Sequence, residues 1–330
     1  MKFRIFAFFV LSIMVLNTFA DTKAAKSNGS ELISLLPASD GVMILDSRRF
    51  FSDSLAKLLS SNQPMLAKAT GEIEKFQARF GVDLRQFESI AVGSNFRQIS
   101  EKNYDFDPVL IGRGQVSSAS IIASAKQAAK GKVREERVGD RVMYVFEEKV
   151  SLLDPGQGSV VAREAAVAAL DSVTVAFGDS ARVRQTLEGK TKVGSDIAAL
   201  LNRAPGAVTS FAAKVPAGMK SFIPMENDEL GKNIDSIQYL YGNADVAGDV
   251  ASLHVTARTL QNAQAKSLHE TLEGLQVLGK AFLGGAKGAD KQVYARMVSN
   301  AKFTVRANEV IFDLQVPQSD IDILVGSFKK

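Results

Sequence analysis

The stretch AVAALDSVTVAFGDSARVRQTL, residues 166–187, contains the local patterns that decide the fold of this chain. Two apolar runs, 166–170 and 173–177, are separated only by Asp171-Ser172, which are residues that favour turns. Short apolar runs joined by such a pair are typical of a tight β-hairpin. The first half of this stretch therefore predicts two neighbouring antiparallel strands.

The second half of the same stretch predicts a capped helix. The second apolar run ends at Gly178-Asp179-Ser180, and Val183 and Leu187 then follow at helical spacing. Side chains such as Asp and Ser accept hydrogen bonds from the free N–H groups of a first helical turn. This role explains the triplet, which also resembles the opening of some secreted esterase motifs, without any catalysis.

The order strand, capping residue, helix recurs along the chain, at 42–59, 109–129 and 253–282. The longest predicted helix covers residues 260–282. Its expected buried stripe steps by three or four residues through Leu260, Gln264, Leu268, Leu272, Leu275 and Phe282.

Other segments read as strands that pair without a crossover helix. Further strands are expected at 87–93, 142–146, 237–241, 250–257, 302–306 and 310–316, with a final helix at 319–328. Residues 242–245 (Gly-Asn-Ala-Asp) have turn chemistry and are expected to form a loop. In the last strand Val310, Phe312, Leu314 and Val316 alternate with polar residues, which predicts one packed face and one open face.

These elements predict an α+β protein. The order β-α-β-β-α-β in the first half, with a looser repeat in the second, suggests a duplicated ferredoxin-like plan with antiparallel sheets and helices on one face. The first half is expected to cover residues 31–215 and the second 235–330, separated by a turn-rich segment at 216–233. The two halves could share one core.

The N-terminus is typical of a secretory signal peptide. Lys2 and Arg4 precede an apolar run of 12 residues, 5–16, and the segment ends in small residues at Thr18 and Ala20. A span of the bilayer needs about 20 apolar residues, so this run is too short to remain inserted. We expect a signal peptide at 1–20, cleavage after Ala20, a flexible lead-in at 21–30, and a periplasmic or extracellular protein with no stable membrane insertion.

Composition narrows the partners and the chemistry. The chain has no cysteine, which excludes disulfides, thiolate metal sites and a lipidated cysteine after cleavage. Its 40 basic and 36 acidic residues give +4, and loss of Lys2 and Arg4 leaves 38 and 36, or +2. The densest basic patch, 130–137, also contains two glutamates and is expected to be a solvated loop, so nucleic acid is not an expected partner.

The two histidines are weak candidates for a site. His254 is expected on the solvent face of its strand with Ser252 and Thr256. His269 is followed by Glu270 and Glu273, but a zinc-protease helix would need a second histidine where Glu273 stands. We therefore predict no metal site.

Serine, glycine and carboxylate patterns are equally weak. Ser54-Leu55-Ala56-Lys57 matches the Ser-x-x-Lys of penicillin-binding enzymes, but their other motifs are absent and a solvated first helical turn explains it. Residues 284–288 are expected to end a helix, and 111–114 lack the third glycine of a dinucleotide site. The carboxylate pairs 147–148 and 228–229 fall in polar sequence expected to be loop. No catalytic, cofactor-binding or metal-binding residue is predicted.

Two segments resemble a group of exported bacterial proteins of unknown function, of acidobacterial type. The first is residues 35–46, with Leu-Leu-Pro followed by a strand and Asp46; the second is 80–84, Phe-Gly-Val-Asp-Leu, followed by the strand at 90–93. The resemblance implies export and this kind of fold, and it implies no activity.

The sequence therefore favours a non-catalytic periplasmic or secreted protein that binds a macromolecular partner, either a protein or another envelope component, through an open sheet face. The alternative is a secreted hydrolase whose serines or carboxylates come together only in the fold.

Overall fold

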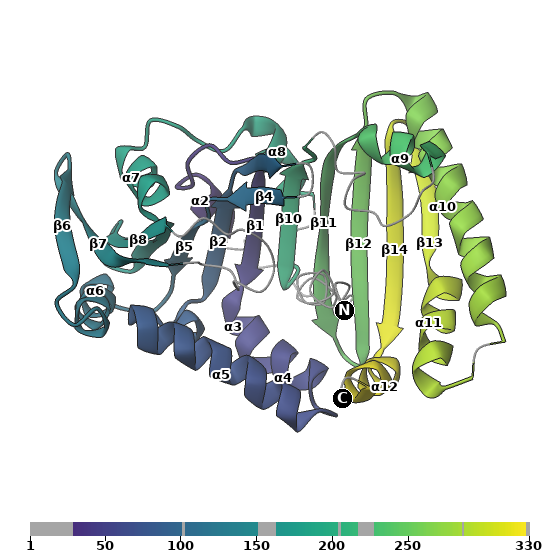
Figure 1. Cartoon of the computed structure of the whole chain (residues 1–330), viewed down its shortest axis with the longest axis horizontal. Helices are drawn as coiled ribbons and strands as arrows, with labels where there is room; N and C mark the ends of the chain where they lie inside the picture. Colours follow the sequence, from purple (N-terminus) through teal and green to yellow (C-terminus); the bar gives the residue numbers. More distant parts are fainter. Residues whose placement is uncertain are drawn as a thin grey trace. The chain divides into compact units, whose positions relative to one another are not determined.

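The computed structural model describes residues 29–100, 103–150, 163–203, 206–216, 228–285 and 287–327 (Figure 1). The predicted signal peptide, most of the lead-in and most of the segment at 216–233 lie outside these residues. Helices and antiparallel strands are mixed along the described chain, which confirms the α+β class. None of the helices in these ranges is long and apolar enough to cross a membrane.

The chain divides into two compact units. Unit 1 contains the segment 54–64 and the described residues from 206 onward, and unit 2 contains the described residues of 29–53 and 65–203. The segment 54–64 therefore belongs to the unit formed by the C-terminal part of the chain, and sequence patterns gave no sign of this.

Unit 2 is built on strands paired in the order β1-β2-β5-β9-β8-β7-β6. Neighbouring strands in this order are antiparallel. The bounds are β1 (Gly41–Asp46), β2 (Ser89–Ser94), β5 (Val109–Arg113), β6 (Val133–Val138), β7 (Arg141–Val150), β8 (Arg163–Ala169) and β9 (Thr174–Asp179). A separate two-stranded hairpin is formed by β3 (Phe96–Ser100) and β4 (Asn103–Phe106).

The helices of unit 2 follow the predicted capped starts in two cases. Ser117 accepts a hydrogen bond from Ser120 N at the start of α6, and Asp179 caps α7. The bounds are α2 (Gly29–Ile33), α3 (Ser47–Arg49), α5 (Gln63–Phe80), α6 (Ser118–Ala128), α7 (Ser180–Glu188) and α8 (Ser195–Leu201), with a 3-10 turn at Leu84–Gln86 and a π-helical stretch at Phe50–Ser54. Helix α5, which starts in unit 1 at residues 63–64, was not predicted.

The core of unit 2 is centred on phenylalanines from distant segments. Phe80 at the end of α5 packs against Phe177 of β9 and Phe146 of β7, with ring centroids 5.0 Å and 5.7 Å apart. Phe76, one turn earlier on α5, adds a further edge contact to Phe177. Edge-to-face aromatic pairs stabilise a fold by more than their buried area alone. This cluster therefore fixes α5 on the sheet.

The expectation of helices on one face is wrong for unit 2. All six residues of β9 are buried, so both faces of the sheet are covered there. Val175 and Phe177 join the cluster that contains the α6 residues, while Ala176 and Ala168 are fully buried on the opposite face. Helix α7 contacts β8 and β9, and these small alanines leave room for a helix to pack closely.

Unit 1 is built on strands paired in the order β10-β11-β12-β14-β13, again with antiparallel neighbours. The strand bounds are β10 (Thr209–Lys214), β11 (Ile237–Ala247), β12 (Val250–Thr259), β13 (Lys302–Arg306) and β14 (Glu309–Pro317). The helices are α4 (Leu55–Leu58), α9 (Asp228–Asp235), α10 (Asn262–Leu283), α11 (Ala289–Asn300) and α12 (Gln318–Ser327).

The predicted alternation on the last strand is confirmed. Val310, Leu314 and Val316 of β14 are buried in the clusters that pack against α10, α11 and α12, whereas Gln315 between them is exposed. The stripe predicted for α10 is correct only in its middle. Leu268 is buried, but Leu260 precedes the helix and is exposed, and so is Phe282 near its end.

The loop predicted at 242–245 is wrong, because these residues lie inside β11 and are buried. The actual turn is at Gly248, with φ of 57°, and Asp249. Gly242 is required by packing: a Cβ there would lie 1.9 Å from the carbonyl oxygen of His254 on β12. A glycine that would also suit a turn is needed here because two strands approach each other closely.

The solvated loop predicted at 130–137 is also wrong in its second half, which forms β6 at the end of the strand order. Several of its charges form ion pairs, and Arg134 donates to both carboxylate oxygens of Glu164 on β8 at 3.0 Å and 2.7 Å. Charged side chains are common on such terminal strands, where they discourage pairing with other chains. The carboxylate pairs at 147–148 and 228–229 likewise lie in β7 and α9 instead of loops.

The duplicated ferredoxin-like arrangement is not confirmed. That plan contains a split β-α-β unit with parallel strands, whereas neighbouring strands within each of the two units are antiparallel. In unit 2, a long helical segment joins β1 to β2. A β-α-β unit would make these two strands parallel, but they pair antiparallel.

The segment 54–64 is fixed to the last helix of unit 1. Asn62 is buried and its side-chain Nδ2 donates to the carbonyl oxygen of Val325 in α12 at 2.6 Å. Gln318, the first residue of α12, donates from Nε2 to the carbonyl oxygen of Lys57 at 3.0 Å. Side-chain amides thus satisfy backbone carbonyls at the ends of short helices, where these groups have no intrahelical partner.

Candidate functional site

The Ser-x-x-Lys match does not form a catalytic pair. Ser54 ends the π-helical stretch, is 1% exposed, and its Oγ has no hydrogen-bond partner in the part of the chain that is described. Lys57 instead extends toward Asp249, with Nζ 3.9 Å from Oδ1. A nucleophilic serine needs an adjacent base and access to substrate, and Ser54 has neither among these residues.

The histidines pair with single carboxylates. His254 Nδ1 lies 2.6 Å from Asp313 Oδ1 on the neighbouring strand, and His269 Nδ1 lies 3.5 Å from Glu273 Oε2. Ser252 and Thr256, expected on a solvent face with His254, are buried, so that expectation is wrong. The cross-strand neighbours Asp245 and Tyr241 are buried as well, which makes this face a packed one along β11 and β12.

No group of three or more metal-ligating side chains occurs within the described ranges. A broad groove of about 830 Å³ lies between α5 and α6 in unit 2. Neither histidine lines it, and neither do Ser54 and Ser180. Its polar lining includes Glu74, Gln77, Ser117, Ser120, Ser124 and Gln127.

The capping role predicted for Gly178-Asp179-Ser180 is confirmed. Asp179 Oδ1 accepts hydrogen bonds from Ala181 N at 3.0 Å and Arg182 N at 3.3 Å. Gly178 has φ of 148°, and a Cβ there would lie 2.3 Å from the carbonyl oxygen of Pro108. The turn therefore needs glycine, and it directs the first turn of α7 against the chain before β5.

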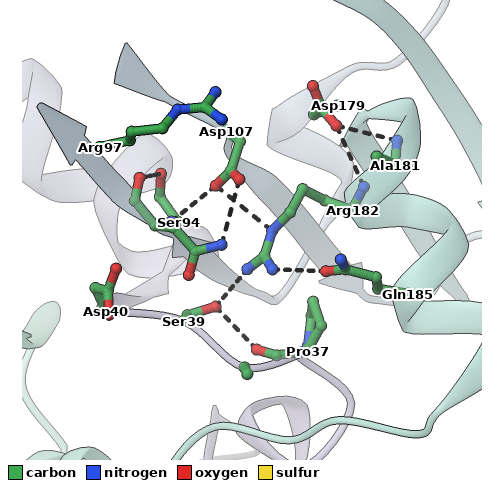
Figure 2. A network of polar contacts seen from close by, with 12 residues as sticks. Pro37, Ser39, Asp40, Ser94, Arg97, Asp107, Asp179, Ala181, Arg182 and Gln185 are labelled. Carbon is green, nitrogen blue, oxygen red and sulfur yellow. Dashed lines mark hydrogen bonds and ion pairs between the residues drawn. The ribbon is translucent and has the colours of Figure 1, made fainter. Parts of the chain in front are cut away.

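Arg182 on that first turn is the centre of a polar network that sequence patterns did not reveal (Figure 2). Its side chain is buried, with the residue 2% exposed. Nη2 donates to Ser39 Oγ at 2.7 Å and Nη1 donates to Gln185 Oε1 at 2.7 Å. Nε lies 3.6 Å from Asp107 Oδ1, which forms an ion pair with the guanidinium.

The network joins three segments that are distant in sequence. Ser39 Oγ, which accepts from Arg182, donates to the carbonyl oxygen of Pro37 at 2.9 Å. Asp107 accepts from Asn95 N at 2.8 Å and from Asn95 Nδ2 at 3.2 Å. Because Asn95 and Asp107 directly flank β3 and β4, Arg182 holds the root of that hairpin.

Electrostatics explain why this arginine can be buried. Burial lowers the pKa of Arg182, and the carboxylates of Asp107, Asp179 and Asp40 act in the opposite direction. A buried charge is tolerated when it is paired and hydrogen-bonded, as here. Ser39 both accepts from Arg182 and donates to Pro37 O, so its hydroxyl is committed to the network. The arrangement positions the chain and supplies no nucleophile.

The β3–β4 hairpin is also held by contacts of Phe96 with the start of β1. Phe96 and Phe106 face each other across β3 and β4, with ring centroids 5.4 Å apart. Phe96 lies against Gly41, where a Cβ would be 2.4 Å from its Cζ, and its backbone N donates to Asp40 Oδ2 at 3.2 Å. Glycine at the start of β1 thus creates the space that the ring occupies.

The hairpin exposes apolar side chains to solvent. Ile99 is 49% exposed and Phe106 is 38% exposed. Arg97 is exposed on the same hairpin and forms an ion pair with the buried Asp105, and this hydrogen-bonded carboxylate raises the pKa of Arg97. An element that is fixed at its root and apolar at its surface is suited to contact another molecule.

No model of a known protein family and no curated protein matches this chain. Among solved structures it is similar to crystal forms III, IV and I of TP0453, at 8%, 8% and 9% sequence identity and TM-scores of 0.45, 0.47 and 0.45. The overlap covers 90%, 91% and 89% of this chain and 98%, 100% and 96% of the TP0453 chains. At this level the likeness carries no information on function.

Proposed function

We propose that this protein is exported, acts without catalysis, and binds a protein or another macromolecule of the cell envelope through the β3–β4 hairpin. Export rests on the predicted signal peptide at 1–20, with cleavage after Ala20, and on the resemblance to exported bacterial proteins. The place of action is then the periplasm or the outside of the cell.

The observation that carries the proposal is the hairpin itself. Ile99 and Phe106 are exposed on a two-stranded element whose root is held by the buried Arg182. Binding costs conformational entropy when a flexible segment must be ordered, and an element already held in place avoids part of that cost. Aromatic anchors of this kind often dominate the energy of protein interfaces.

The alternative, a secreted hydrolase, would need a nucleophile and a base facing a common space. Ser54 is buried, and Ser180 is the first residue of α7, beyond the cap formed by Asp179. Among the described residues, His254 pairs with Asp313 and His269 with Glu273. Hydrolytic activity would therefore contradict the proposal, and the experiment includes a measurement of it.

The test is affinity capture of mature protein, residues 21–330, from the native envelope fraction. Three baits are compared: the unaltered chain, the hairpin variant Ile99→Ser with Phe106→Ser, and the control Val173→Ser. Val173 is 39% exposed and also belongs to unit 2, so the control changes a similar apolar surface elsewhere. We expect a reproducible partner with the first and third baits and its loss with the second.

Folding of each bait is checked by thermal unfolding before capture. A partner retained at full yield by the hairpin variant would place the contact on another surface. Hydrolysis of model esters or peptides by the purified protein, with no captured partner, would favour the hydrolase instead.

A further inference from the structure

Helix α10 presents a continuous ridge to solvent. Exposed residues follow one another three or four positions apart, which places them on one side of the helix. They are Lys266, Glu270, Glu273, Gly274, Val277, Leu278, Ala281 and Phe282. The opposite side, with Ala265 and Leu268, is buried against the sheet of unit 1 (Figure 1).

The second half of this ridge is apolar although it is exposed. Val277 is 65% exposed, Leu278 66% and Phe282 87%. The outward side of a surface helix is normally polar, so three adjacent large apolar side chains indicate a contact surface. Gly279 on the inward side lies close to Val298 of α11, with a Cβ there 3.2 Å from Cγ1, so α11 covers a different side of the helix.

The charges along α10 change sign across the apolar centre. Glu270 and Glu273, the charges nearest to Val277 on its N-terminal side, precede it, and the exposed Lys280 follows it, while Lys266 lies one turn before Glu270. Glu273 and Lys280 lie on the same flank of the ridge, since they are seven residues, or two turns, apart. In two antiparallel helices related by a twofold axis, each residue on one side of the axis meets a residue from the other side.

We propose that the α10 ridge binds a second copy of this chain, with two α10 helices packed antiparallel around a twofold axis close to Val277. Glu273 of each copy then faces Lys280 of the other. Val277 and Leu278 form the centre, and Gly274, which has no neighbouring atom within 4 Å of a Cβ position, lets the helices approach closely there. This inference does not rest on the proposed envelope partner.

Self-complementarity favours this occupant over two others. A flat anionic lipid surface would bring Glu270 and Glu273 of the same ridge against like charge. An unrelated protein would need its own groove with charges in the matching order, whereas a second copy has that order already. A pair of helices alone buries less than the roughly 1,200 Å² of a stable interface, so the dimer is expected to be weak, with a dissociation constant on the order of micromolar.

The first test is a charge exchange measured by analytical ultracentrifugation of mature protein over 1–100 µM. Glu273→Lys and Lys280→Glu alone are each expected to raise the dissociation constant by about three- to tenfold, because each creates two like-charge contacts. The double variant restores opposite charges and is expected to return the constant toward that of the unaltered chain. Failure of the double variant to recover dimerisation, with both singles impaired, would refute the antiparallel pairing.

Two apolar variants test the same surface. Phe282→Ser is expected to weaken the dimer by tenfold or more, while Leu260→Ser, which changes a residue 61% exposed just outside the helix, is the matched control. A dimer unaffected by Phe282→Ser would place the interface elsewhere. A monomer at every concentration, or association seen only with vesicles of anionic lipid, would overturn the proposal.

The absence of cysteine from the chain permits a second, direct measurement. Val277→Cys lies close to the proposed axis, where two copies bring their Cα atoms near the roughly 4.4–6.8 Å that a disulfide needs. Mild oxidation is expected to link two copies of this variant much faster than two copies of Leu260→Cys. Equal rates for the two variants would argue against the axis.

Discussion

At the scale of single residues, Arg182 shows how one buried charge can organise distant parts of a chain. Its guanidinium contacts Ser39, Asp107 and Gln185, and Asp107 in turn accepts from the backbone N–H and the side-chain amide of Asn95. The separation of 143 residues between Ser39 and Arg182 means that this contact forms only in the folded chain. The network therefore couples the position of the hairpin to the folding of unit 2.

Replacement of Arg182 should be costly. We expect Arg182→Met to lower the free energy of unfolding by about 2–4 kcal/mol, because the half-buried Asp107 would lose its charged partner and Ser39 and Gln185 would lose the hydrogen bonds from the guanidinium. The control Arg184→Gln, two residues along the same helix, removes a partly exposed ion pair with Glu136 and should cost about 1 kcal/mol. Urea unfolding followed by circular dichroism measures both; equal small losses would show that the network contributes little.

Sequence patterns predicted the surroundings of this network but not the network. Asp179 was identified as a helix cap because a strand, a small turn and a helical spacing follow one another in the sequence. Arg182 three residues later has the spacing of any solvated arginine on a first turn. Its burial depends on Asp107 and Ser39, which only the three-dimensional fold brings close.

At the scale of elements, periodicity identified strands and helices wherever one side of the element faces solvent. It succeeded for β14 and for the middle of α10, where apolar and polar residues alternate with the period of the element. It failed for β11, where Gly242 and Asp245 are buried in a strand. Helix α5 was not predicted although Leu66, Ile73, Phe76 and Phe80 have helical spacing along it. Where polar residues are buried together with apolar ones, as in β11, the sequence does not alternate between the two and periodicity cannot identify the strand.

Replacement of two glycines by alanine is expected to change the free energy of unfolding in opposite directions. Gly242→Ala places a methyl group against the backbone of β12, so we expect a loss of about 1–3 kcal/mol of unfolding free energy. Gly71→Ala lies in α5 with no atom within 4 Å of its Cβ position, so we expect a gain of about 0.5–1 kcal/mol from helix propensity. Chemical denaturation of both variants is the measurement, and destabilisation by Gly71→Ala would contradict the open environment.

At the scale of the whole molecule, disulfides make no contribution to stability. The chain contains no cysteine, and no metal-ligating cluster occurs over the described ranges. We therefore expect the midpoint of thermal unfolding to change by less than about 1 °C on addition of dithiothreitol or EDTA. A fall of several degrees with EDTA alone would reveal a bound cation that contributes to stability by linkage.

The attachment of residues 54–64 to the final helix has a consequence for the time course of folding. Asn62 reaches the carbonyl oxygen of Val325 across 263 residues of chain, and Lys57 accepts from Gln318 across 261. During synthesis or export from the N-terminus, the early segment must wait for nearly the whole chain before its partners exist. Unit 1 therefore cannot be completed in the order in which its residues emerge, because residues 54–64 bind to residues 318–325. Contacts of such high sequence separation slow folding, since the intervening chain must first be ordered.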